Sequence, residues 1–294
     1  MTRPYALALH GGAGVNPGRD YAEVEAHLRI VVDAGKAKLA EGALALDVVE
    51  WAVAQLESSG LYVAGRGAAP NTAGVVEFDA AIVDGTTMRA GSVCAIQDVV
   101  SPIGAARAVL EKTPHVMLAG NGATLFAREQ RLALIADSGQ YFTMPVGVVQ
   151  ADIDAEATGL NHGTVGAVAC DREGRLAAAT STGGTFGKRP GRVGDSPIPG
   201  VGAWADGTMA GSCTGIGEYF IMAGGAGDVS ARMRYAGETL EPACRAMLDT
   251  VARLGGDGGI IAMGADAVPV FAWNSRGLKR AAAGSGFATM VAIT

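Results

Sequence analysis

The expected strands of this sequence come in consecutive groups, and the expected helices form groups of their own. Alternating apolar residues between turn residues predict strands, and apolar residues at three- and four-residue steps predict helices. Strands are expected at residues 5–9, 76–83, 89–96, 115–119, 165–170, 175–180, 209–213, 259–263, 268–273, 279–283 and 287–293. Helices are expected at residues 24–39, 44–56, 102–112, 121–131, 217–223, 229–236 and 240–254. Because strand and helix do not strictly alternate, the pattern predicts an α+β fold of stacked antiparallel sheets with helices outside.

Length and apolar content favour one large core. The chain has 294 residues and 49% of them are hydrophobic, so we expect a single domain over residues 1–294. Only 5% are aromatic, which leaves Ala, Val, Leu and Ile to fill the interior. The 44 glycines stand singly rather than in linker tracts, which indicates tight turns and close backbone approaches.

The charge balance and the cysteines restrict the partners and the compartment. With 23 basic and 29 acidic residues, the chain has no general attraction to phosphate backbones, so nucleic acid is not an expected partner. No stretch reaches the roughly 18 apolar residues of a membrane span, and the first residues lack the features of a secretory signal. The four cysteines lie far apart, as expected for buried thiols in a reducing compartment. We therefore expect a cytoplasmic protein that needs no membrane partner.

A break in periodicity precedes Thr164. Residues 141–163 show no apolar face and predict an exposed linker, whereas a hairpin with the turn 171–174 begins at Thr164. Cleavage after Gly163 would make Thr164 an N-terminus, whose amine titrates at about 7.7–8.0 and can serve as the base for its own hydroxyl. Gly163 leaves room for a strained peptide bond there. Taken alone, this Gly-Thr pair equally fits an ordinary turn before a strand.

Other catalytic motifs fail on their own spacing. Gly187-Lys188 is followed by Arg189, which excludes a P-loop. The His10-Gly11-Gly12 turn has no Gly-x-Ser-x-Gly elbow downstream, as a lipase would require. The four histidines lack metal-ligand spacing, so we expect no catalytic cofactor.

Five blocks then occur together: LALHGGAG, HGTVGAVACDREGRLAAATSTGG, PGRVGDSPIPGVGAWAD, SCTGIGE and GGDGG. In sequence and order they resemble the plant-type asparaginase/isoaspartyl peptidase family of N-terminal-nucleophile hydrolases, across nearly the whole chain. The resemblance implies a four-layer αββα sandwich and autocleavage into an α chain, 1–163, and a β chain, 164–294. It also implies a homodimer of such αβ units.

The same resemblance implies the roles at the site. Thr164 is the nucleophile, and Thr182 lies beside its amine and hydroxyl. Arg192 and Asp195, with Val193 and Gly194 between them, bind a substrate that carries an α-carboxylate and an α-ammonium. Such groups suit a two-pronged arginine contact and an acidic partner, although in isolation the pair fits a surface ion pair equally well.

A second segment is implied to stabilise the developing negative charge. Thr214 and Gly215 correspond to the family's oxyanion pair, followed by Ile216 and by Gly217, which lets the backbone approach the substrate ammonium. In isolation this stretch fits the glycine-rich start of a helix.

Two further features concern residues 56–66. The resemblance implies a structural sodium ion held by the backbone carbonyls of Leu56, Glu57, Ser59, Tyr62, Ala64 and Arg66. The sequence departs from the family at Val63, where an Asn usually directs a hydrogen bond toward the nucleophile region. Valine has no such donor, so slower self-cleavage or turnover is expected.

The leading hypothesis is hydrolysis of L-asparagine and β-aspartyl dipeptides through an aspartyl-Thr164 ester. A glycosylasparaginase activity is the alternative enzyme, although Gly163 stands where that branch usually has Asp. A third alternative is an uncleaved module that binds small amino acids without catalysis.

Overall fold

The computed structural model describes residues 3–149 and 162–294. Its central element is an eight-stranded sheet in the order β12-β11-β1-β5-β6-β2-β3-β4. The paired strands are antiparallel except β3 and β4, which run parallel. The bounds are β1 Ala6–His10, β2 Phe78–Asp84, β3 Arg89–Ile96, β4 Met117–Ala119, β5 His162–Cys170, β6 Leu176–Thr185, β11 Arg280–Gly284 and β12 Met290–Ala292. Strands from both sides of Gly163 therefore lie in one sheet.

A second sheet of four strands packs on the first in the order β10-β9-β8-β7. Its strands are β7 Ala203–Ala205, β8 Met209–Gly215, β9 Gly258–Gly264 and β10 Pro269–Trp273. The core between the sheets consists largely of alanine, such as Ala8, Ala81, Ala178 and Ala210. Small side chains let the two sheets approach closely, which explains why so few aromatic residues suffice.

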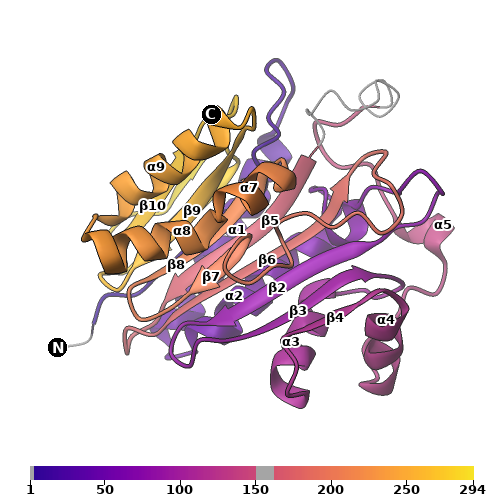
Figure 1. The fold of residues 1–294 in the computed structure, drawn as a ribbon, viewed down its shortest axis with the longest axis horizontal. Helices are drawn as coiled ribbons and strands as arrows, with labels where there is room; N and C mark the ends of the chain where they lie inside the picture. Colours follow the sequence, from indigo (N-terminus) through magenta and orange to yellow (C-terminus); the bar gives the residue numbers. More distant parts are fainter. Residues whose placement is uncertain (1–2, 150–161) are drawn as a thin grey trace.

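Helices cover the outer faces of both sheets (Figure 1). The helices after the first strands are α1 Ala22–Ala40, α2 Ala45–Ser59, α3 Pro102–Lys112, α4 Gly120–Glu129 and α5 Ser138–Tyr141. Those of the second half are α7 Gly217–Ala223, α8 Gly225–Ala231 and α9 Leu240–Arg253. One core lies between the large sheet and α1 to α3, and another between the small sheet and α7 to α9. The four-layer αββα sandwich is thus confirmed.

Sequence patterns predicted the start of α3 correctly but failed for two short strands. The Ser-Pro pair predicts the start of α3, where the Ser101 hydroxyl accepts a hydrogen bond from the Gly104 amide. The expectation of a buried strand at residues 115–119 was wrong, because β4 is a short, partly exposed strand at the sheet edge. The pattern also missed β7, whose three residues are too few to show a period.

The sequence predicts an exposed linker at residues 141–163. Its beginning packs against residues 61–66, since the amides of Thr143 and Val146 donate to the carbonyls of Arg66 and Leu61. The beginning of the expected linker is therefore hydrogen-bonded to the rest of the protein. Residues 150–161 lie outside the described residues.

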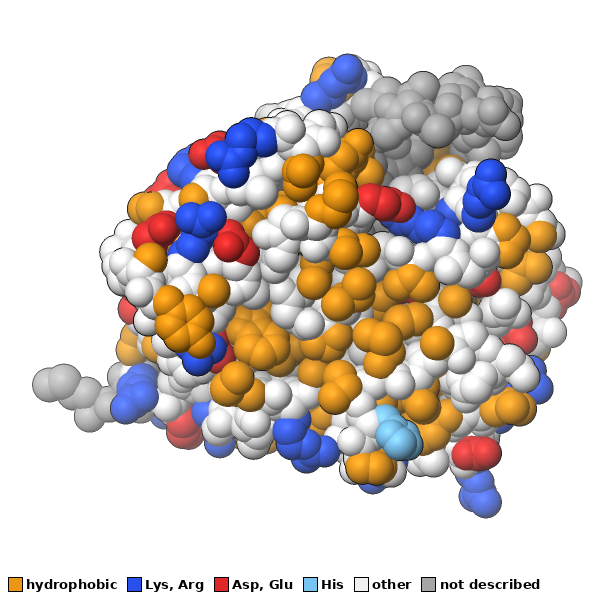
Figure 2. All heavy atoms as spheres, in the orientation of Figure 1, with side chains coloured by type: hydrophobic (Ala, Val, Ile, Leu, Met, Phe, Trp, Pro, Cys, Tyr) orange, Lys and Arg blue, Asp and Glu red, His pale blue; other side chains and the backbone are white. Residues whose placement is uncertain are grey.

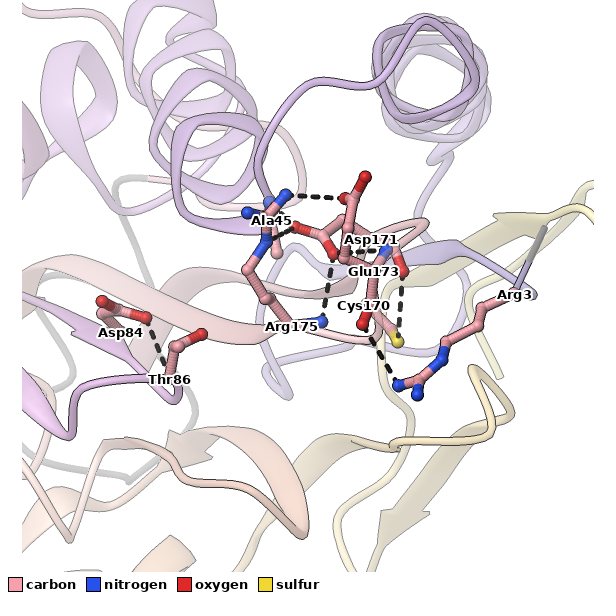
Figure 3. A network of polar contacts seen from close by, with 8 residues as sticks. All are labelled: Arg3, Ala45, Asp84, Thr86, Cys170, Asp171, Glu173 and Arg175. Carbon is pink, nitrogen blue, oxygen red and sulfur yellow. Dashed lines mark hydrogen bonds and ion pairs between the residues drawn. The ribbon is translucent and has the colours of Figure 1, made fainter.

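The turn between β5 and β6 is fixed by a buried carboxylate (Figure 3). Asp171 accepts from the amides of Ala45, Glu173 and Arg175 and from Arg175 Nε, at 2.8 to 3.1 Å. One carboxylate thereby closes the hairpin and joins it to the first turn of α2. Among the described residues, no helix is long and apolar enough to cross a membrane.

Candidate active site

Thr164 lies near the start of β5, on the face of the large sheet that meets the small sheet. It is directly opposite Thr182 of β6, and both side chains are buried. The Thr182 hydroxyl donates to the Gly163 carbonyl oxygen at 2.9 Å and accepts from the Gly184 amide at 3.0 Å. The second threonine therefore polarises the carbonyl of the peptide bond that precedes Thr164.

The Gly11–Gly14 turn brings the two sheets together at this point. Gly12 has a positive φ of 101°, and a Cβ there would lie 3.2 Å from Gly163 Cα and 3.3 Å from Thr164 N. The next amide, of Ala13, donates to the Thr214 hydroxyl of β8 at 3.3 Å. The turn thus joins the predicted nucleophile to the predicted oxyanion donor, which comes from the other sheet.

Gly215 ends β8, and Ile216 precedes the first turn of α7. A Cβ at Gly215 would lie 2.4 Å from the Asp257 carbonyl oxygen, so this strand end requires glycine. The Ile216 amide donates to the same carbonyl at 3.2 Å. This hydrogen bond and the close approach of Gly215 to Asp257 fix the backbone immediately after Thr214.

The predicted substrate-binding residues lie at the N-terminal end of α7. Arg192 makes a two-pronged contact with Glu218 of α7, at 2.7 and 2.8 Å. Asp195 is buried beside Gly217, where a Cβ would lie only 2.8 Å from the carboxylate Oδ1. A Cβ at Gly194 would lie 3.0 Å from the Arg192 guanidinium, so the glycine leaves room for that side chain. Arg192 is therefore paired with Glu218, and the surface ion pair between Arg192 and Asp195, which the sequence left open as an alternative, is not formed.

Asp195 carries an unused acceptor. Its Oδ2 atom is buried without a hydrogen-bond partner among the described residues. Burial raises the pKa of Asp195 to about 7, against the opposing effect of Arg192. A buried carboxylate with a free oxygen is a suitable partner for a ligand ammonium, which would supply both a donor and a positive charge.

His10 is a residue of the site that the sequence analysis did not assign. It ends β1, is fully buried and lies 3.0 Å through Nδ1 from the Thr164 carbonyl oxygen. Burial lowers the pKa of His10 to about 3, so the ring is neutral. A carbonyl only accepts, so Nδ1 carries the proton and Nε2 accepts from Ser212 Oγ at 2.9 Å. A polar residue at the end of an apolar strand was the available signal.

The sequence analysis also did not assign Asp79 and Lys188 to the site. Asp79 lies on β2 directly opposite Thr182, and its side chain is fully buried. Lys188 is buried in the loop after β6, and its Nζ donates to the Glu77 carbonyl at 2.6 Å. Burial raises the pKa of Asp79 to about 6, while Lys188 and Arg192 act to lower it. A charged residue within the apolar strand FDAAIVD was the only sequence signal.

Val63 lies against the bond that was expected to break. A Cβ placed on Gly163 would lie 2.8 Å from both Cβ and Cγ2 of Val63, and the Val63 carbonyl accepts from the Gly183 amide at 2.9 Å. The position where the family usually has Asn thus contacts the predicted cleavage site. Here it supplies only an apolar surface.

A layered αββα sandwich with a buried threonine at the start of a central strand is the arrangement of N-terminal-nucleophile hydrolases. Comparison with known proteins agrees, since residues 3–293 match the family described as asparaginase. The chain is 42% identical to the isoaspartyl peptidase of Salmonella typhimurium, over 94% of each chain. It is 41% identical to the plant-type L-asparaginase of Pyrobaculum calidifontis, over 93% of this chain and 95% of that one. The chain belongs to the asparaginase family.

Proposed function

We propose that this protein hydrolyses β-aspartyl dipeptides and L-asparagine after cleaving its own Gly163–Thr164 bond. The observation that carries the proposal is the 2.9 Å hydrogen bond from Thr182 to the Gly163 carbonyl, which belongs to the peptide bond that the Thr164 hydroxyl would attack. Attack by that hydroxyl would put negative charge on an oxygen that already accepts a hydrogen bond. The resulting ester is opened by water, which leaves a Gly163 carboxylate and a free Thr164 amine.

In turnover, the Thr164 amine takes the proton of its own hydroxyl, and the oxygen attacks the β-amide carbonyl of the substrate. Thr214 and the backbone at Gly215 stabilise the oxyanion. Ammonia or an amino acid leaves, and water hydrolyses the aspartyl-Thr164 ester. Arg192 binds the substrate α-carboxylate and Asp195 its ammonium. This role requires Arg192 to exchange part of its contact with Glu218 for the substrate.

The relatives carry both names, isoaspartyl peptidase and L-asparaginase, which supports the pair of substrates. The test is a denaturing gel of aged protein together with N-terminal sequencing and aspartate release from β-Asp-Leu and L-asparagine. Two fragments, one beginning at Thr164, and released aspartate are expected. A fully cleaved sample that releases aspartate from neither substrate would remove the substrate assignment. Cleavage of an N-glycosidic asparagine linkage would instead indicate a glycosylasparaginase, and an intact chain that binds aspartate the binding module.

We also propose a sodium ion in the loop of residues 56–66. Close turns at Gly65 and Gly67 gather carbonyls there, since a Cβ at Gly67 would lie 2.1 Å from the Tyr62 oxygen and 2.9 Å from that of Gly60. The carbonyls of Leu56, Ala64 and Arg66 accept hydrogen bonds from within the chain, and a carbonyl oxygen has two lone pairs. This donor set fits a hard cation. A higher melting temperature in sodium chloride than in choline chloride at equal ionic strength is expected.

A dimer of αβ units in the cytoplasm completes the proposal. Hydrophobic side chains gather over the middle of one face of the molecule (Figure 2), which is typical of an interaction surface. Met88 and Val116 are about half exposed, at 51% and 52%, and line a groove with Trp204. All four cysteines are buried free thiols, as suits a reducing compartment. Sedimentation equilibrium at twice the mass of one chain would support the dimer.

A further inference from the structure

Three polar side chains form a row across the large sheet. Thr164 of β5 is directly opposite Thr182 of β6, which is in turn directly opposite Asp79 of β2. Directly opposed residues share one face of a sheet, with Cβ atoms about 4.5–5.5 Å apart. Ala81 and Val168, each an even number of residues along the strand from Asp79 and Thr164, lie in the core between the sheets. The row therefore faces the small sheet.

One oxygen of Asp79 is held and the other is unused. Oδ1 accepts from the Ala95 amide at 2.8 Å, at an irregularity between β2 and β3 where Ala95 has a positive φ of 46°. Oδ2 is buried and has no hydrogen-bond partner in the described part of the chain. A buried carboxylate oxygen without a donor is costly, so its retention next to the reacting threonines calls for an explanation.

The Thr182 hydroxyl has one proton and two acceptor sites. In the uncleaved chain its proton goes to the Gly163 carbonyl, and one acceptor site takes the Gly184 amide. Cleavage separates Gly163 from Thr164 and gives Thr164 a new amine. To act as the base, this amine must point its lone pair at the Thr164 hydroxyl, so its N–H groups must donate hydrogen bonds to other acceptors. Thr182 then needs a new acceptor for its proton and a free lone pair toward that amine.

We infer that Asp79 is a positioning residue. Once the chain is cut, its Oδ2 accepts a hydrogen bond from the Thr182 hydroxyl, so that the Thr182 oxygen can accept a hydrogen bond from the Thr164 amine. No covalent bond is made or broken, because the hydroxyl only rotates. All three sites of Thr182 are then used, by Asp79, the Gly184 amide and the Thr164 amine. This role rests on the proposed self-cleavage and assigns Thr182 opposite hydrogen-bonding roles before and after it.

Two cations oppose the effect of burial on Asp79. Burial raises its pKa to about 6, whereas Lys188 and Arg192 act to lower it and Glu77 acts to raise it. Cys94 on β3 and Asp195 are the other titratable groups that interact with its charge, since Asp79 acts to raise the pKa of each. Lys188 makes no ion pair shorter than 4 Å with Asp79, so Oδ2 stays available to Thr182.

Asp79→Asn tests the role with almost no change of shape. The Ala95 amide requires an acceptor, so the amide oxygen of Asn turns to it and the NH₂ group faces Thr182 as a donor. Self-cleavage should stay within about threefold of wild type, whereas kcat should fall about 10- to 100-fold with KM changed less than about threefold. Asp84→Asn, the same change on the same strand away from the site, should alter none of these values.

An Asp79→Asn enzyme with wild-type kcat, or one that loses self-cleavage in parallel with turnover, would overturn the role of Asp79. A wild-type control that neither cleaves nor hydrolyses would instead remove the proposed function. If Asp79→Asn does not fold, a crystal structure of cleaved wild-type enzyme decides. The inference requires Thr182 Oγ1 within about 3.2 Å of Asp79 Oδ2, and an Oδ2 that is still unpartnered contradicts it.

Discussion

Buried carboxylates lie at both ends of the hairpin formed by β5 and β6, but they differ in how many hydrogen-bond partners they have. At the turn end, Asp171 accepts four hydrogen bonds within the chain (Figure 3). At the threonine end, defined by Thr164, Thr182, Asp79 and Asp195, each of the two carboxylates keeps one oxygen without a partner among the described residues. A carboxylate with all its partners stabilises the fold, whereas a buried carboxylate with an unpaired oxygen is a candidate for binding a ligand or a reacting group. We infer from this difference that the turn end serves the fold and the threonine end serves the reaction.

The largest effect is expected from Thr164→Ala at the threonine end. Without the hydroxyl no ester can form, so the chain should remain in one piece and aspartate release should fall by at least about 10⁴-fold. The measurement is a denaturing gel over days, together with the aspartate assay. Thr164→Ser, which keeps a hydroxyl, is the matched control and should still cleave. Undiminished asparagine hydrolysis by the Ala variant would contradict the whole account of the site.

Asp195→Asn should give the next largest effect. An amide cannot neutralise the substrate ammonium, so kcat/KM should fall about 100- to 1000-fold, with most of the loss in KM. The control substrate is a β-aspartyl analogue without the α-ammonium, which should be hydrolysed almost equally by both enzymes. Equal losses on the two substrates would show that Asp195 does not bind the ammonium.

The same carboxylate predicts the direction of a pH effect. Folding raises the pKa of Asp195 to about 7, so the folded protein holds that proton more tightly than the unfolded chain. The stabilisation is therefore complete below about pH 4 and is lost as the pH rises through 7. Urea unfolding between pH 5 and 8 should show a smaller decline for Asp195→Asn than for wild type. Substrate binding should show the reverse, improving as Asp195 ionises.

At the turn end, Asp171→Asn should reduce stability and leave catalysis intact. The new NH₂ group faces at least one of the donors that Asp171 now satisfies, so the free energy of unfolding should fall by about 2–3 kcal/mol. Glu173→Gln breaks only the exposed ion pair to Arg175 and should cost less than about 0.5 kcal/mol. Denaturant titration measures both. A fall in kcat of the folded Asp171→Asn enzyme would contradict the division between the two ends.

The turn end is also the part that the sequence could predict. The hairpin is local, and its alternation and turn residues predict both strands and the turn at residues 171–174. The layers could be predicted as well, because grouped strands and helices allow few other architectures. The threonine end is different, since His10 and Ser212 meet across 202 residues and sheet register places Asp79 opposite Thr182. No local pattern contains such contacts.

Resemblance supplied what local patterns could not, but only for residues with a role in the family. It implied Thr182 and Thr214, and the structure places them next to Gly163 and to the Gly11–Gly14 turn. It did not indicate that Arg192 would pair with Glu218. That pairing depends on where α7 begins relative to the loop before it, a three-dimensional relation that charge and spacing along the chain do not determine.

The smallest effect is expected at Val63, where the threonine end departs from its family. An Asn amide there could donate toward Gly163, whose Cα lies against the Val63 side chain. A second donor on the scissile carbonyl would stabilise the oxyanion of self-cleavage. We expect Val63→Asn to cleave about three- to tenfold faster, at a stability cost of about 1 kcal/mol for burying the amide.

Val63→Ala distinguishes the effect of a hydrogen-bond donor at this position from the effect of side-chain bulk. It removes the apolar contact with Gly163 and adds no donor to the scissile carbonyl, so it should cleave no faster than wild type. The rate of fragment appearance in freshly purified protein measures both variants. If Val63→Ala cleaves faster and Val63→Asn does not, side-chain bulk against Gly163, and not a missing hydrogen bond, sets the cleavage rate.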